Sequence, residues 1–128
     1  MATAFDEDVI QLLAEIEEVA IETRAGPDAP AHRTTIWVVV DGDATYVRSV
    51  RGTRGRWYRE AMACPEVVVY AGERRLPAHV EPVSDLTTIA RVSDALLRKY
   101  VQWPNDSRAM VREEVLPTTL RLQPAEAS

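Results

Sequence analysis

Residues 34–58 read TTIWVVVDGDATYVRSVRGTRGRWY and carry the strongest structural signal in the chain. The run 34–40 is rich in β-branched and aromatic residues, which favour a strand. Its alternate residues point to opposite faces, and both faces are apolar: Ile36, Val38 and Val40 on one, Trp37 and Val39 on the other. Both faces should therefore be covered, one by a barrel interior and the other by a helix or a second subunit.

The segments on either side extend this strand into an antiparallel sheet. Asp41-Gly42-Asp43 predicts a tight hairpin turn, and Ala71-Gly72-Glu73 predicts another. Further strands are expected over 19–23, 44–50, 67–70, 75–83 and 118–122, and helices over 6–16, 57–63, 86–102 and 106–115. With about six strands, the sheet is expected to curl into a small barrel, which removes its exposed edges. The sequence predicts one α+β domain over 1–128, with frayed ends at 1–4 and 124–128.

Length, charge and composition narrow the functional classes. The chain has 128 residues, 46% of them hydrophobic and 27% charged, so it can bury a core as one domain. Its single cysteine, Cys64, excludes an intrachain disulfide, and His32 and His79 are too far apart in sequence to indicate a metal site. No apolar run approaches the ~20 residues that span a bilayer, and the acidic residues 6–8 do not fit a signal peptide. We therefore expect a cytoplasmic protein without membrane contact.

A basic segment follows the central hairpin. The net charge of the chain is −5, yet residues 48–59 contain no acid and several arginines, namely Arg48, Arg51, Arg54, Arg56 and Arg59. The overall negative charge argues against general affinity for nucleic acid. A local cationic patch on an acidic protein instead suggests a specific anion, with a solvated charged loop as the alternative.

The same segment has the parts of a phosphate cradle. A strand ends at Val50, a loop with Gly52 and Gly55 follows, and a helix begins near Trp57. Glycines let the backbone approach a ligand, the first N–H groups of a helix attract an anion, and arginine forks bind phosphate oxygens. Hydroxyl groups that could add hydrogen bonds are those of Thr34, Ser49 and Thr53. The spacing fits neither a Walker loop nor a dinucleotide-binding turn.

The order of motifs over residues 17–124 resembles the flavin-binding split-barrel proteins, and most closely their deazaflavin-dependent nitroreductase branch. The resemblance is carried by these stretches: Arg33-Thr34-Thr35-Ile36-Trp37, Tyr46-Val47-Arg48-Ser49, Trp57-Tyr58 with its short helix up to Cys64-Pro65, the apolar strand Val67-Val68-Val69, and Arg112-Glu113-Glu114-Val115-Leu116-Pro117. A small family of short split-barrel proteins, known only by a domain-of-unknown-function label, is similar as well.

This resemblance implies a six-stranded antiparallel split β-barrel with flanking helices, usually a homodimer. It implies FMN or a deazaflavin coenzyme in a groove at the subunit interface, with the following cofactor-binding residues: Arg33, Thr34, Ile36, Trp37, Arg48, Ser49, Arg51, Gly52, Arg54, Gly55, Arg56, Trp57 and Tyr58. The phosphate would lie near the loop 51–56 and the ring near the strand ends at 36–37 and 48–49. Hydride transfer would belong to the cofactor, so no catalytic side chain is expected.

Three functions remain open at this point. The first is a flavin- or deazaflavin-dependent oxidoreductase that acts on a small-molecule substrate. The second is a non-enzymatic module of the same fold that binds a cofactor or another anionic small molecule. The third, a nucleic-acid-binding domain that uses the basic loop, is disfavoured by the net acidity of the chain. Arg56, Cys64 and Thr35 depart from the pattern of the deazaflavin branch, so the choice of cofactor stays open.

Overall fold

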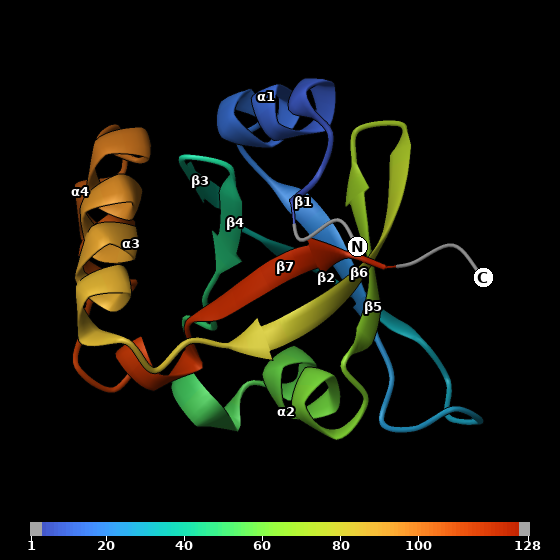
Figure 1. The fold of residues 1–128 in the computed structure, drawn as a ribbon. Coiled ribbons are helices and arrows are strands. Elements are labelled where there is room, and N and C mark those ends of the chain that lie inside the picture. The colour runs from blue at the N-terminus through green and yellow to red at the C-terminus, as the bar shows by residue number, and fades with distance from the viewer. Residues whose placement is uncertain (1–3, 126–128) are drawn as a thin grey trace.

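The computed structural model describes residues 4–125 as a curled antiparallel sheet with helices around it, which confirms the predicted α+β class (Figure 1). The elements in chain order are α1 Glu7–Glu15, β1 Val19–Thr23, β2 His32–Ile36, β3 Val39–Asp41, β4 Ala44–Val47, the 3-10 helix η1 Gly52–Arg54, α2 Arg56–Ala63, β5 Glu66–Ala71, β6 Arg74–Pro82, α3 Leu86–Lys99, α4 Pro104–Ala109, the 3-10 helix η2 Leu116–Thr118 and β7 Leu120–Pro124.

The sheet in the described residues has seven strands, in the order β2-β1-β5-β6-β7-β4-β3, and all neighbours are antiparallel. The expectation of six strands is wrong, because the run 34–40 does not form one strand. It forms the end of β2, which pairs with β1 at one edge of the sheet, and the start of β3, which pairs with β4 at the other edge. Only Trp37 and Val38 separate these two strands, so the sheet must curl to bring its edges together (Figure 1).

Side chains at the end of α3 explain why the strand breaks at Val38. The backbone N–H of Val38 donates to the Tyr100 hydroxyl at 3.1 Å, and the Val38 carbonyl accepts from Lys99 Nζ at 2.6 Å. The Tyr100 hydroxyl also donates to the Glu17 carbonyl at 2.7 Å. Buried backbone groups need hydrogen-bond partners, and here side chains supply the ones that a neighbouring strand would otherwise give. The chain can therefore leave one edge of the sheet and join the other.

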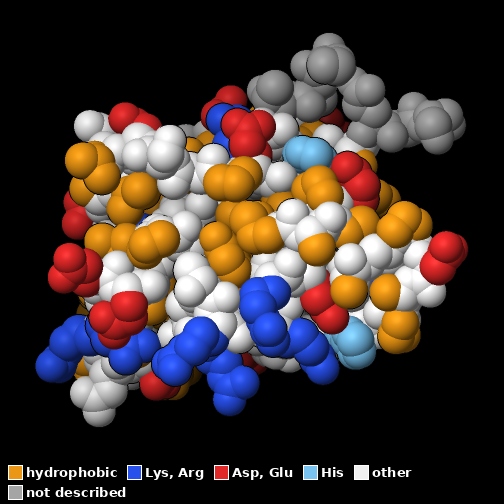
Figure 2. All heavy atoms as spheres, turned by 90° about the horizontal axis from the view of Figure 1, so that it is seen from below, with side chains coloured by type: hydrophobic (Ala, Val, Ile, Leu, Met, Phe, Trp, Pro, Cys, Tyr) orange, Lys and Arg blue, Asp and Glu red, His pale blue; other side chains and the backbone are white. Residues whose placement is uncertain are grey.

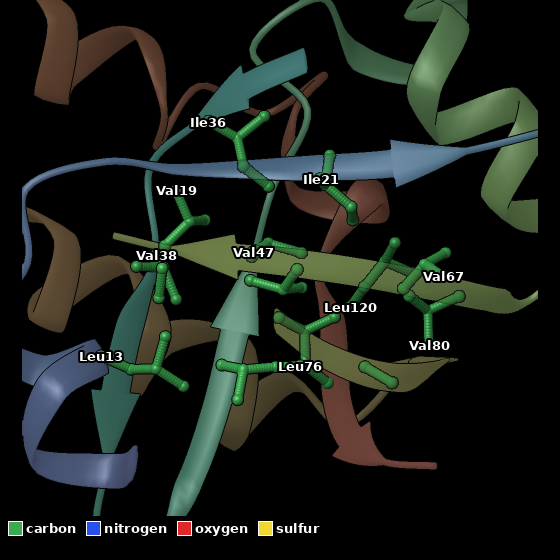
Figure 3. Close-up of a cluster of buried hydrophobic side chains, with 14 of the residues drawn as sticks. Leu13, Val19, Ile21, Ile36, Val38, Val47, Val67, Leu76, Val80 and Leu120 are labelled. Carbon is green, nitrogen blue, oxygen red and sulfur yellow. The ribbon is translucent and has the colours of Figure 1, made fainter. Parts of the chain in front are cut away.

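A buried apolar cluster fills the inside of the curled sheet (Figure 3). Side chains from β1, β4, β5, β6 and β7 point into it, together with Leu13 of α1 (Figure 3). Trp57 of α2 belongs to the same cluster. Ile36 and Val38 lie in this cluster and Val40 packs against it, as the alternation of residues 34–40 predicts. Each fully buried aliphatic side chain of this kind stabilises the fold by roughly 1.5–3 kcal/mol.

A second apolar cluster covers the outer face of β3 and β4. Val39 of β3 and Tyr46 of β4 pack there against Val92 and Leu96 of α3, and Trp37 borders the cluster. Both faces of the run 34–40 are thus covered, one by the barrel interior and one by a helix, as the sequence predicts. The N-terminus of α3 is capped by Asp85, whose carboxylate accepts from the Thr88 N–H at 2.9 Å.

Several element ends differ from the expected ones. The returning strand β4 stops at Val47 rather than 50, α3 stops at Lys99 rather than 102, and the helix expected over 106–115 is the shorter α4. Pro124 is the last residue of β7, and the Ala125 N–H donates to the Pro77 carbonyl at 3.0 Å. Of the ends that are expected to fray, 1–4 and 124–128, residues 1–3 and 126–128 lie outside the described residues. None of the helices in residues 4–125 has the length and apolarity to cross a membrane.

Candidate functional site

A cavity of about 770 Å³ lies where β2, the end of β4, the loop 48–55, the start of α2 and α4 meet. Most of the residues that the resemblance implies for the cofactor line it: Thr34, Ile36, Trp37, Arg48, Ser49, Arg51, Gly55, Arg56 and Trp57. Its wall also contains residues that are not among those implied for the cofactor, namely Glu18, Thr35, Val50, Asp106 and Met110. The volume lies within the usual range of pockets for small molecules and cofactors.

Two of the implied residues lie away from this cavity and have other partners. Arg33 pairs with Glu22 at 3.2 Å, and its guanidinium lies over the Tyr70 ring, 3.8 Å from the ring centre. Tyr58 packs against the barrel core and meets the indole of Trp57 edge to face, with the ring centres 6.4 Å apart. Neither side chain lines the cavity.

The loop between β4 and α2 is ordered by hydrogen bonds of Ser49. The Ser49 hydroxyl donates to the Gly52 carbonyl at 2.8 Å, the Gly52 N–H donates back to the Ser49 carbonyl at 2.9 Å, and the Ser49 N–H donates to Thr118 Oγ1 at 3.0 Å. A Cβ built on Gly55 would overlap the Ser49 hydroxyl. A larger residue at 55 would therefore have to displace the Ser49 hydroxyl from its place in the loop.

The second glycine of the loop, Gly52, is buried and does not line the main cavity. Its φ of +68° lies in the left-handed region, which favours glycine, and a Cβ there would come within 3.2 Å of the Glu114 carbonyl oxygen. The loop thus packs closely against the segment that follows α4. Arg54, also outside the main cavity, borders a smaller adjoining hollow instead.

Arg48 brings a buried positive charge to the wall of the cavity. Only 1% of its surface is exposed. Its guanidinium donates to Thr119 Oγ1 at 2.9 Å, to Ser93 Oγ at 2.9 Å and to the carbonyls of Met110 at 3.0 Å and Ile89 at 2.8 Å. All four acceptors are neutral, and no carboxylate among residues 4–125 pairs with it. Burial lowers the pKa of Arg48 to about 10, so it remains a cation at neutral pH.

The rim of the cavity beside α2 is also positively charged. Arg51 and Arg56 are exposed, and neither has an ion-pair or hydrogen-bonding side-chain partner in the described part of the chain. The first turn of α2 contains no acid, and Gly55 provides no side-chain cap, so its first N–H groups add to the positive potential. Figure 2, a view from below Figure 1, shows basic side chains next to one another on this face.

Apolar side chains form the remaining wall. Ile36 and Trp57 belong to the barrel core, and Met110 is buried beside α3. The Trp37 indole is stacked on the Tyr100 ring, with the ring centres 3.7 Å apart and the planes parallel. The cavity therefore combines a cationic side with aromatic and aliphatic walls, which suits a flat organic molecule that carries an anionic group.

A polar cluster missed by the sequence analysis connects α2 and β2, two of the elements that line the cavity, with β1. The Thr23 hydroxyl donates to Glu60 Oε1 at 2.9 Å, and His32 Nδ1 lies 3.0 Å from Glu60 Oε2. Glu60 is buried in α2, one turn after Arg56, and His32 lies two residues before Thr34 in β2. The cluster ties α2 to β1 and β2 and so fixes one wall of the cavity. Only the folded structure brings these three residues together.

Comparison with known protein families finds a match over most of the chain. The family described as "Uncharacterized protein conserved in bacteria (DUF2255)" matches residues 9–122. No protein with a curated description matches the sequence.

Several solved structures have the same fold. HutZ, the heme storage protein of Vibrio cholerae, is 11% identical, with a TM-score of 0.65 over 99% of this chain and 93% of HutZ. ChuZ of Campylobacter jejuni is 8% identical, with a TM-score of 0.72 over 92% of this chain, which spans only 52% of ChuZ. An F420-H2-dependent reductase, FDR-A, is 14% identical, with a TM-score of 0.62 over 83% of this chain and 93% of the reductase. The expected split-barrel fold is confirmed.

Proposed function

Because the chain belongs to this bacterial family, DUF2255, and has the split-barrel fold, we propose that it is a cofactor-binding protein that holds a flavin-type cofactor in its main cavity. The proposed activity is that of an oxidoreductase, with FMN or a deazaflavin coenzyme as the cofactor. The observation that carries the proposal is the meeting of uncompensated arginines with an aromatic wall in one cavity of about 770 Å³.

The residues present fit such a cofactor. A phosphate group needs cationic or N–H donors that are not already neutralised, and Arg51, Arg56 and the start of α2 offer them. A flavin-type ring needs a flat apolar slot with a few polar groups, and Ile36, Trp37 and the Arg48 guanidinium border that part of the cavity. An anionic ligand would also give the buried Arg48 a counter-charge that the described residues lack.

The side chains then have separable roles. Arg51 and Arg56 hold the phosphate, while Ile36 and Trp57 keep water from the inner part of the cavity. Arg48 is fixed by four hydrogen bonds, so its charge is already oriented before a ligand enters. When bound, the cofactor supplies the hydride chemistry.

A heme ligand is less well supported by the same cavity. HutZ is a heme storage protein, so heme is a reasonable alternative on the basis of the fold. The residues that line the cavity in the described part of the chain include Met110 but no histidine, cysteine or tyrosine, which are the common proximal ligands of heme iron. The donor set therefore favours a flavin-type cofactor.

A non-enzymatic role is the second candidate function. Its support is the likeness to HutZ over nearly the whole length of both chains, since that protein stores its ligand. In this case the cavity would carry or sense a cofactor or another anionic small molecule. The same side chains would bind the ligand, and only the fate of the bound molecule would differ.

A homodimer is part of the proposal. Val50 at the rim of the cavity is 47% exposed, and Leu97 and Val101, at the C-terminal end of α3, are exposed as well. A second copy of the chain could cover such apolar surface and close the open side of the cavity. Sedimentation equilibrium tests this part, with a dimer expected and a monomer at all concentrations contradicting it.

Hydride transfer by the loaded protein separates the two candidate functions. The protein is loaded with FMN or the deazaflavin coenzyme, the cofactor is reduced, and a nitroaromatic acceptor is added. An oxidoreductase should reoxidise the bound cofactor faster than the same concentration of free cofactor. If bound cofactor is reoxidised no faster than free cofactor over a panel of acceptors, the binding module is the better description.

A further inference from the structure

A second hollow of about 460 Å³ adjoins the main cavity. It is lined by Val50, Arg51, Arg54 and Arg112, and it shares Val50 and Arg51 with the main cavity. Arg112 is not among the residues that the family resemblance implies for the cofactor. The positively charged rim of the main cavity therefore extends into this hollow, whose lining residues include no aromatic side chain.

The packing of two distant segments places these arginines together. Arg112 donates from Nη2 to the Val50 carbonyl and from Nε to the Ala109 carbonyl, both at 3.1 Å. Gly52, at the start of η1, lies close to the Glu114 carbonyl. These contacts fix the segment 109–114 against the loop that carries Arg51 and Arg54.

The charges around this hollow are poorly balanced. One carboxylate is close, that of Glu114, which lies 3.4 Å from Arg112 Nε with both side chains at least half exposed. Arg51 and Arg54 have no ion-pair partner in residues 4–125. Like charges held near one another cost free energy unless an anion lies between them, and arginine forks suit oxyanions.

We propose that Arg51, Arg54 and Arg112 form a second anion subsite, which takes an additional oxyanion group of the ligand in the main cavity. The subsite therefore suits a molecule with two or more negatively charged groups in series. The position of the first anionic group, in the main cavity, rests on the proposed function. The position of the second group rests only on Arg51, Arg54 and Arg112. Arg51 is shared, so it contacts both groups.

Calorimetric titration with inorganic phosphate, pyrophosphate and citrate tests this subsite without any cofactor. Pyrophosphate should bind more tightly than phosphate, and Arg54→Ala and Arg112→Ala should each weaken pyrophosphate binding by about fivefold to tenfold while phosphate binding changes less than about twofold. Arg51→Ala should weaken both. Citrate distinguishes a subsite for any oxyanion, which would accept it, from one selective for phosphates.

The control variant is Arg98→Ala, an exposed arginine of α3 that lines neither hollow. Pyrophosphate binding that is unchanged in both Arg54→Ala and Arg112→Ala, or weakened equally by Arg98→Ala, would overturn the subsite. If pyrophosphate binding depends on Arg54 and Arg112 but FMN and the deazaflavin coenzyme do not bind, the subsite stands and the proposed function fails. If the coenzyme binds and neither variant affects it or pyrophosphate, only the subsite fails.

Discussion

The indole of Trp37 lies flat on the phenol ring of Tyr100, with the ring centres 3.7 Å apart. The hydroxyl of the same tyrosine accepts the N–H of Val38, the next residue after Trp37, at 3.1 Å. One side chain from the end of α3 therefore both ends β2 and positions an aromatic wall of the cavity. Tyr100 thus explains both the end of β2 and the position of Trp37 in the cavity.

Tyr100→Phe should destabilise the protein, because it keeps the ring stack but leaves the buried Val38 N–H without its acceptor. We expect a loss of roughly 1–3 kcal/mol in the free energy of unfolding, measured by urea denaturation. Tyr46→Phe is the matched control, since Tyr46 is also buried but has no hydrogen bond from its hydroxyl among residues 4–125. Equal effects of the two variants would show that the Tyr100 hydroxyl is not the fixing contact.

Gly55→Ala should disturb the loop that forms one side of the cavity. The new methyl group would displace the Ser49 hydroxyl from the Gly52 carbonyl, so we expect a loss of roughly 1–3 kcal/mol in stability and weaker cofactor binding. Gly26→Ala is the control, because a Cβ there meets nothing within 4 Å and should change stability by less than roughly 0.5 kcal/mol. A Gly55→Ala protein as stable as the control would contradict the assigned packing.

Replacement of Arg48 should lower the stability of the protein, whereas replacement of Arg51 should lower its affinity for the ligand. Arg48→Met takes the donor from two buried carbonyls, one buried hydroxyl and one half-buried hydroxyl, so we expect a loss of roughly 2–5 kcal/mol in stability. Arg51→Met should change stability by less than roughly 0.5 kcal/mol and act on ligand affinity instead. Thermal unfolding of the two variants checks this, and a similar loss in both would mean that Arg48 does not anchor the fold.

Lys99 should make stability depend on pH in the alkaline range. Its Nζ donates to the carbonyls of Leu13 and Val38, and burial lowers its pKa from 10.5 to about 8. Between these two values the unfolded chain binds more protons than the folded one, so the contribution of Lys99 to the free energy of unfolding rises as pH rises from about 8 towards 10.5.

The measurement for Lys99 is urea unfolding of the wild type and Lys99→Met at several pH values up to about 9.5. The variant loses the hydrogen bonds at every pH, but the difference in stability between the two proteins should grow with pH. Other titrating groups are common to both proteins and cancel in this difference. A difference that stays constant or shrinks with pH would mean that the pKa of Lys99 is not lowered by burial.

Local patterns were sufficient to predict much of the fold. The two-residue alternation of the run 34–40 predicts which residues share a face and that both faces are covered, because this information is contained in consecutive side chains. The break at Val38 could not be predicted in this way. It depends on Tyr100 and Lys99, more than sixty residues away in sequence, and nothing in the apolar run itself signals a break.

Some residues of the candidate site could likewise be predicted from the local sequence, and others could not. The arginines and glycines of the loop 51–56 are adjacent in sequence, so their joint appearance near a helix start was predictable. The structure separates them into two groups, with Arg56 at the main cavity and Arg54 at the smaller hollow. Asp106 and Arg112 come from a distant segment and carry no local signal, which is why tertiary packing alone brings them to the site.

The most direct test of the central claim is a fluorescence titration of the purified protein with FMN and with the deazaflavin coenzyme. It compares the wild type with an Arg51→Ala, Arg56→Ala double variant and with an Arg75→Ala, Arg98→Ala control, which removes two exposed arginines outside both hollows. We expect saturable binding of at least one cofactor by the wild type and the control, and at least tenfold weaker binding by the double variant. Wild-type protein that binds neither cofactor, or a double variant that binds as tightly as the control, would contradict the assignment of this cavity.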